Sequence, residues 1–332
     1  MITKNASSRR YFDEIDVVKG IAILTVLWHH SMIRYPIYML DIPWCRYARH
    51  INATYFLVVF FLVSGYLFAH SRPKPFIETL GDKVRRLLVP YLSFELINTF
   101  FKLMSPELVN RKIESVGAYV EKVLLYGGEL WFVYCLFLMF VVWPPILQRI
   151  EKPAMCGAVL LLCVLNVLMP KDVMGGVLLY PQFVFYSIFF VAGYLLRDID
   201  RGLLQDGRLF LVVSVLFLVF CVFCVESIKI PYIGRYLKCA IGCFFVWMLS
   251  FRILKYKRIS RLLAFAGRYS LPYYWLNGFA LVVARALIVS VLHVSFTPMI
   301  AICIFLICVV LETVGILAVR RWPYVRCLIG IK

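Results

Sequence analysis

The stretch Asp16–Ser31, DVVKGIAILTVLWHHS, places ionisable side chains at both ends of an apolar run. Asp16 and Lys19 stand near its start, and His29 and His30 stand near its end. Ionisable groups inside a membrane span usually face the interior of a helix bundle or a watery cavity, and they mark a functional site. An interfacial Asp–Lys pair, with the histidines at the opposite headgroups, is the alternative that this pattern leaves open.

A helix over this stretch places Lys19 and His30 on one face. Each residue turns by ~100°, so the eleven steps between them come within ~20° of three full turns. His29 falls ~80° away from Lys19, whereas Asp16 shares the general face of Lys19. Lys19 and His30 are then ~16 Å apart along the axis, about half of a ~30 Å hydrocarbon core. This arrangement predicts that Lys19 and His30 lie at two depths of one channel, but it does not identify a reaction.

The chain that must position these residues is 332 residues long, 63% hydrophobic and only 16% charged. Soluble domains average about 45–50% apolar residues, so the composition predicts a membrane protein. We expect an all-α, polytopic membrane helix bundle of about ten transmembrane helices, forming a single domain over residues 1–332 with no fused soluble domain. The apolar windows that predict these spans are 15–33, 51–70, 87–104, 131–147, 154–169, 181–197, 209–226, 233–251, 270–290 and 298–319. The fourth window is the least clear at its start, where YVEKVLLYGGELWF is also compatible with a preceding interfacial segment.

The distribution of basic residues predicts the orientation of these spans. With ten spans and the N-terminus inside, 24 of the 36 lysines and arginines fall on inner segments. Because cytoplasmic loops carry the excess of positive charge, both termini are expected in the cytoplasm and the protein in the plasma (inner) membrane. The N-terminal region has no small-residue cleavage site after its apolar core, so we interpret it as the first span and not as a cleaved signal peptide.

Charge and cysteine content exclude two other classes. The net charge of +18 comes from short basic clusters between apolar runs, without the basic helix or sheet that reads nucleic acid. Most of the eleven cysteines lie within apolar runs, where they resemble small buried hydrophobes. Cys221 and Cys224 form a CxxC pair, but their apolar surroundings disfavour a redox role. No nucleic-acid partner and no metal are expected.

Six segments in the same order resemble the acyltransferase-3 family of integral membrane acyltransferases. Lys19 and His30 match its basic residue and histidine with ten residues between them. The other five segments are VVFFLVSGYLF (58–68), DKVRRLLVPYL (82–92), GGELWFVYCLF (127–137), FYSIFFVAGYLL (185–196) and AGRYSLPYYWLNGF (266–279). In the last segment many members carry a histidine where this chain has Asn277, an amide that cannot shuttle a proton near neutral pH.

The resemblance implies transfer of an acyl group, commonly acetyl, from cytoplasmic acyl-CoA to a glycan or glycolipid across the membrane. The expected partners are therefore membrane lipid, an acyl-CoA donor such as acetyl-CoA, and a glycan acceptor. His30 is then the catalytic residue, which either accepts the proton of the acceptor hydroxyl or carries the acyl group. Asp16 would pair with Lys19 or orient neighbouring groups.

Basic side chains at the cytoplasmic mouth suit the anionic donor, and Lys19, Arg85 and Arg86 are the candidates for acyl-CoA binding. Positive-inside topology alone is the competing explanation for such arginines, and it applies more strongly to three others. These weaker candidates are Arg258, Arg261 and Arg268.

The remaining candidates each have two interpretations. Ser64 and the backbone beside Gly65 are donors for a developing oxyanion, or they form a small-residue packing site between helices. Trp131 and Asn277 are acceptor-side candidates, although aromatic residues at a membrane boundary often serve as belt anchors. Further polar residues in the spans have no assigned role: Glu95, Asn98, Asn166, Gln182 and Glu312.

An exporter or proton-coupled transporter of a glycan-related substrate is the alternative function, with the intramembrane charges as its relay. The chain shows no pair of interrupted apolar segments in corresponding positions of its two halves, which is the sequence pointer to many transporter sites. This comparison favours the enzyme.

Overall fold

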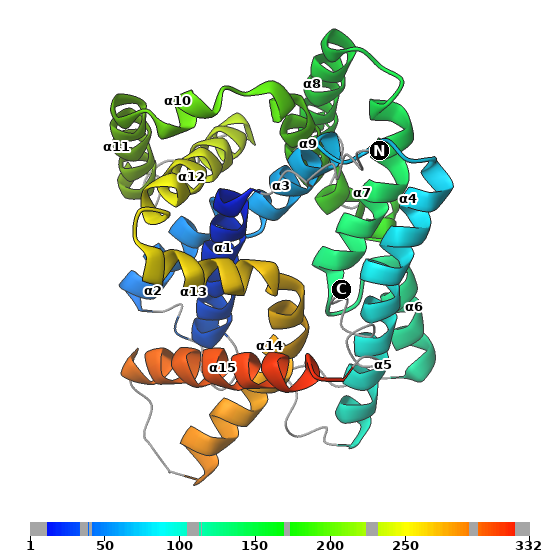
Figure 1. Ribbon diagram of the computed structural model, residues 1–332. Helices are drawn as coiled ribbons and strands as arrows, with labels where there is room; N and C mark the ends of the chain where they lie inside the picture. Colours follow the sequence, from blue (N-terminus) through cyan, green and yellow to red (C-terminus); the bar gives the residue numbers. More distant parts are fainter. Residues whose placement is uncertain are drawn as a thin grey trace, which may run out of the picture.

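The computed structural model describes residues 12–33, 39, 42–104, 113, 115–168, 173–223, 232–291 and 298–322. Within these ranges every regular element is helical, as the sequence predicts (Figure 1). The first half forms α1 (Asp13–Ile33), α2 (Pro43–Asn52), α3 (Val58–Ala69), α4 (Phe76–Lys83), the π-helical turn η1 (Val84–Leu88), α5 (Val89–Met104), α6 (Val116–Tyr126), α7 (Trp131–Leu147) and α8 (Lys152–Leu168). The second half forms η2 (Val173–Leu179), α9 (Tyr180–Leu195), η3 (Leu196–Asp198), α10 (Arg201–Gln205), α11 (Gly207–Phe223), α12 (Tyr232–Ile253), α13 (Lys257–Arg268), α14 (Ser270–Arg285), η4 (Ala286–Val291) and α15 (Pro298–Val319).

Several of these helices are long and apolar enough to cross a membrane. Within the described residues there are five, and a sixth if α6 and α7, which are bent by 45°, count as one span. The five are Phe76–Met104, Gly176–Asp198, Gly234–Ile253, Ser270–Ile288 and Met299–Val319. The apolar helices α3, α8 and α11 are shorter. Each of the ten expected windows contains a helix, whereas the number of crossings stays a prediction. Both chain ends lie outside the described residues, so their placement stays a prediction too.

Helix α1 lies in the middle of the molecule and contacts α3, α12, α13, α14 and α15 (Figure 1). Its first turn carries Asp13, Glu14 and Asp16, which favour the positive end of the helix dipole. Glu14 is buried and accepts a 2.6 Å hydrogen bond from the Arg201 guanidinium of α10. Apolar side chains of α1 are buried on nearly all sides, as expected for a helix in the core of a bundle.

Two glycines let α1 cross α13 at backbone contact. A Cβ on Gly20 would overlap the carbonyl oxygen of Leu263, and a Cβ on Gly267 would overlap the carbonyl oxygen of Asp16. Small residues at a helix crossing allow this approach, which larger side chains prevent. The glycine after Lys19 and the glycine before Arg268 are therefore parts of one contact.

Helices α3 and α9 cross in the same manner. A Cβ on Gly65 would overlap the carbonyl oxygen of Phe190, and a Cβ on Gly193 would overlap that of Leu62. The two glycines come from the segments VVFFLVSGYLF and FYSIFFVAGYLL. Close packing therefore accounts for Gly65 and Gly193, and Ser64 lies half-buried beside this crossing.

The cysteines of the described chain lie mostly in the interior. Six are buried, namely Cys45, Cys135, Cys221, Cys239, Cys243 and Cys308, whereas Cys156 and Cys303 are exposed. All those that the structure describes are free thiols. Cys224, the second member of the CxxC pair, lies outside the described residues.

The crossing of α1 and α13 predicts that Gly267→Ala destabilises the protein. The added methyl group meets backbone, which cannot move aside as a side chain can, so we expect a cost of about 1–3 kcal/mol. The midpoint of thermal unfolding of the detergent-purified protein measures this effect. Gly157→Ala on α8 is the control, because its Cβ would meet nothing within 4 Å. Equal midpoints for both variants would contradict the close crossing.

Candidate functional site

The start of α1 holds an ion pair inside the protein. The Lys19 ammonium lies 2.6 Å from a carboxylate oxygen of Asp16, three residues earlier on the helix. The side chains of Lys19 and Asp16 are 20% and 8% exposed. The sequence offered this pairing as one of two roles for Asp16, the other being to orient neighbouring groups, and the ion pair forms.

Two arginines from other elements approach Lys19. Arg86 of η1 and Arg268, the last residue of α13, are close enough for their charges to act on the Lys19 ammonium. Arg268 reaches this position because Gly267 sits against the backbone of α1. The charges of Lys19, Arg86 and Arg268 thus act on one another here, with Asp16 as the ion-pair partner of Lys19. Such a cluster suits an anionic ligand.

The other basic candidates are exposed, as Arg86 and Arg268 also are. Arg85 is exposed on the same π-helical turn as Arg86. Such turns occur frequently at functional sites, and this one interrupts the helix between α4 and α5. Arg258 and Arg261 are exposed on α13, where the Arg261 side chain donates a hydrogen bond to the Lys257 carbonyl. Of the three α13 arginines that the sequence offered, the structure brings Arg268 close to Lys19.

The two histidines have different surroundings near the end of α1. His29 is buried at 9% exposure, and its ring centroid lies 5.1 Å from that of Phe56. His30 is half-buried, and its backbone carbonyl accepts a hydrogen bond of 3.4 Å from the buried Arg285 of α14. The more accessible of the two rings therefore belongs to His30, the residue that shares the face of Lys19 on an ideal helix.

Asn277 is buried in α14 and engages a carboxyl group of α15. Its side-chain amide donates a 3.1 Å hydrogen bond to Oε1 of Glu312, which is 1% exposed. Oε2 of Glu312 has no hydrogen-bond partner in the described part of the chain. One turn away, the hydroxyls of Tyr273 and Thr313 lie 2.6 Å apart. The sequence offered Asn277 and Glu312 separately, and their contact joins the successive helices α14 and α15.

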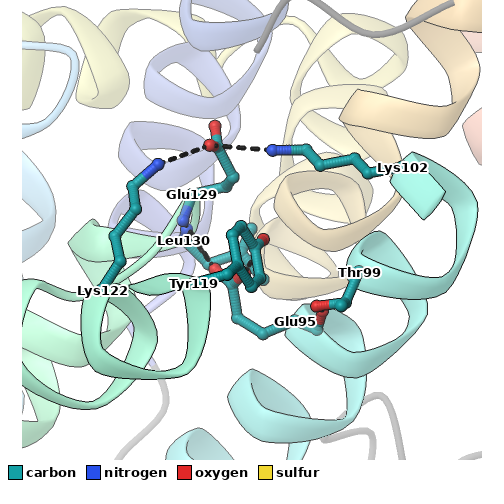
Figure 2. A network of polar contacts seen from close by, with 7 residues as sticks. All are labelled: Glu95, Thr99, Lys102, Tyr119, Lys122, Glu129 and Leu130. Carbon is teal, nitrogen blue, oxygen red and sulfur yellow. Dashed lines mark hydrogen bonds and ion pairs between the residues drawn. The ribbon is translucent and has the colours of Figure 1, made fainter. Parts of the chain in front are cut away.

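Trp131 begins α7 at the break after α6. It is half-buried, and its ring centroid lies 5.9 Å from that of Tyr186 on α9. A polar network that sequence reasoning missed surrounds the break (Figure 2). Its members are Glu95, Thr99, Lys102, Tyr119, Lys122, Glu129 and Leu130. The available signals were a carboxylate within an apolar helix and the Gly-Gly pair ahead of Glu129.

The described residues contain no group of three or more histidine, cysteine, aspartate or glutamate side chains that could hold a metal ion.

Residues 12–316 match the family model of the acyltransferase domain, Acyl_transf_3. The chain belongs to the acyltransferase-3 family. The match extends from the residue before α1 into α15 and includes every candidate described above. Neither the curated proteins nor the solved structures include a significant match to this chain.

Acyltransferase-3 membership makes this multi-pass helical protein a membrane acyltransferase. The candidate site then has two ends on α1: a cation cluster around Lys19 and a histidine pair near the carboxyl end. The network around Glu95 and the Asn277–Glu312 pair lie on other helices.

The ion pair of Asp16 predicts that Asp16→Asn is strongly destabilising. This change leaves Lys19 partly buried among other cations, and breaking a buried pair typically costs about 3–5 kcal/mol. Thermal unfolding in detergent measures the loss, which we expect to shrink at high salt because ions screen the repulsion. Asp198→Asn is the matched control, since its pair with Lys152 is exposed. A midpoint as high as that of the control variant would contradict this assignment.

Proposed function

We propose that this protein transfers an acyl group, in the first instance acetyl, from cytoplasmic acyl-CoA to a hydroxyl group of an extracytoplasmic glycan or glycolipid. It would thus be an O-acetyltransferase of the plasma (inner) membrane that modifies cell-envelope polysaccharide. The observation that carries the proposal is the arrangement along α1, where a cation cluster and an accessible histidine occupy two depths of one helix.

The cation cluster supports the donor side of the proposal. Coenzyme A is strongly anionic, and guanidinium groups bind phosphates through paired hydrogen bonds. Arg86 and Arg268 would take the phosphates, with Lys19 further along the path and Asp16 holding the Lys19 ammonium in place. Acetyl-CoA is then the co-substrate, and the mechanism uses no metal.

His30 supports the reaction side. As a general base, its neutral imidazole takes the proton of the acceptor hydroxyl while the hydroxyl oxygen attacks the thioester carbonyl. The new C–O bond forms, the C–S bond breaks, and the proton passes from the imidazolium to the departing thiolate. As a nucleophile, the same imidazole would first take the acyl group and then release it to the hydroxyl. Both routes require His30 and make ester and free coenzyme A.

The acceptor side of the proposal rests on aromatic and amide groups. Trp131 presents an indole beside Tyr186, and aromatic faces suit the apolar faces of sugar rings. Asn277 is the other acceptor-side candidate, and its amide is tied to Glu312. Ser64 remains a candidate donor to the oxyanion that develops on the thioester carbonyl.

The central prediction is that His30→Ala abolishes acyl transfer without loss of protein from the membrane. Inside-out membrane vesicles supplied with radiolabelled acetyl-CoA measure the reaction as label in the glycan fraction, with mass spectrometry to locate the acetyl ester. His29→Ala is the matched control, because its ring is buried against Phe56, and we expect a milder effect. Acyl transfer by His30→Ala at the level of the unaltered protein would contradict the proposal. Substrate flux into liposomes without covalent change would favour a transporter instead.

The cation cluster makes a second prediction, about the donor alone. Loss of one charge-assisted hydrogen bond is worth about 1.5–3 kcal/mol, so Arg268→Ala should weaken coenzyme A binding roughly 10- to 100-fold. Equilibrium binding of radiolabelled acetyl-CoA to the purified protein measures this. Arg258→Ala removes an exposed arginine from the same helix and should bind nearly as well as the unaltered protein. Equal losses for the two variants would argue for a general charge effect and against a specific site.

A further inference from the structure

Glu95 is a buried carboxyl group on the apolar helix α5, and it has no place in the mechanism above. It is 1% exposed. Oε1 accepts hydrogen bonds from the backbone N–H groups of Glu129 at 2.7 Å and Leu130 at 2.8 Å. Oε2 accepts one from the Tyr119 hydroxyl of α6 at 2.9 Å. One side chain therefore binds both the loop between α6 and α7 and α6 itself (Figure 2).

The loop that binds Glu95 has a shape that only glycine adopts readily. Gly127 and Gly128 have φ values of 72° and 58°, in the left-handed region. A Cβ on Gly128 would overlap the Glu95 carboxylate, so the missing side chain makes room for it. Successive backbone N–H groups after such a turn form a concavity that binds anions. Here the protein fills that concavity with its own carboxyl group.

A second set of contacts, the ion pairs of Glu129, holds the same loop on its more exposed side. Oε1 of Glu129 lies 3.0 Å from the ammonium of Lys102 on α5 and 3.0 Å from that of Lys122 on α6. The Glu129 side chain is 21% exposed, so this pair of bonds lies nearer the surface than those of Glu95. The loop is thus held by α5 through both its backbone and its side chain.

Trp131 follows this loop directly. Leu130, whose N–H binds Glu95, caps the start of α7, and Trp131 is the first residue of that helix. A Cβ on Gly127 would lie 3.1 Å from Cα and 3.2 Å from Cβ of Trp131, so the loop packs against the tryptophan itself. We therefore expect a shift of the loop to move Trp131, and with it the indole that lies beside Tyr186.

We propose that Glu95 is a positioning residue, which fixes the Trp131 indole at the acceptor side by holding the loop 127–130. This inference rests on the proposed function, because it takes Trp131 to contact the acceptor. It assigns a role in acceptor recognition to a carboxyl group that does not touch the acceptor.

The chemistry of the three partners makes Glu95→Gln a sharp test. The hydroxyl and both N–H groups act as donors, and a glutamine offers one acceptor oxygen and a nitrogen that only donates. The amide therefore keeps the size of the side chain and loses part of its bonds to the loop or to Tyr119. Tyr119→Phe is a milder second variant, since it removes the hydroxyl alone.

A double-mutant cycle between Glu95 and Trp131 tests the coupling. In the vesicle assay described above, we expect Glu95→Gln to lower acetyl transfer roughly 10-fold, as the loss of bonds to a buried group suggests. We expect Trp131→Ala to lower transfer by a similar factor. The double variant should transfer within about 2-fold of Trp131→Ala, because both substitutions remove the same function. Acetyl-CoA binding by Glu95→Gln should match that of the unaltered protein.

Matched controls separate this role from general damage. Glu121→Gln removes an exposed carboxylate from α6, and Gly117→Ala adds a methyl group where a Cβ meets nothing within 4 Å. Both should transfer acetyl normally, whereas Gly128→Ala should match Glu95→Gln. Tyr119→Phe keeps the test decisive if Glu95→Gln fails to fold, and we expect its partial loss to disappear in the Trp131→Ala background.

The remaining outcomes contradict the inference in distinct ways. Losses that multiply in the double variant, or equal losses of transfer and acetyl-CoA binding, would assign Glu95 a purely structural role. Normal transfer by both Glu95→Gln and Tyr119→Phe would remove the role altogether. In each case the unaltered protein still transfers acetyl and His30→Ala does not, so the proposed function stands. Absence of transfer by the unaltered protein overturns both proposals.

Discussion

The backbone contact between α1 and α13 is the constraint on which the site depends. Gly20 and Gly267 allow the two helices to meet without side chains between them. Because Gly20 follows Lys19 and Gly267 precedes Arg268, this crossing also brings two cations from distant parts of the chain together. In a bilayer, where helix association depends on close packing, such a contact is an effective way to fix charged groups relative to each other.

The sequence predicted the helices well because apolar length and periodicity are local properties. Each expected window contains a helix, and the unclear start of the fourth window is a separate helix, α6. The number of crossings could not be predicted equally well. Helices α3 and α8 have 12 and 17 residues, and neither composition nor charge distinguishes a short buried helix from a full span.

The site was predictable only where its contacts are local. Asp16 and Lys19 are three residues apart on one helix, and their ion pair follows from that spacing. Arg86 and Arg268 approach Lys19 through the packing of other helices, so the sequence offered them as two among several basic residues. Glu95 and Leu130 are likewise 35 positions apart, and no local pattern links a carboxyl group to a backbone N–H at that distance.

The break between α6 and α7 also bears on how the chain enters the membrane. Exposed backbone groups are tolerated at membrane depth only where protein or water satisfies them, and Oε1 of Glu95 accepts hydrogen bonds from two of them. Helix α5 precedes α6 and α7 in the sequence, so the carboxyl group is synthesised before the backbone that it binds. When the segment with the break between α6 and α7 leaves the insertion machinery, the Glu95 carboxyl group that binds its backbone has therefore already been synthesised.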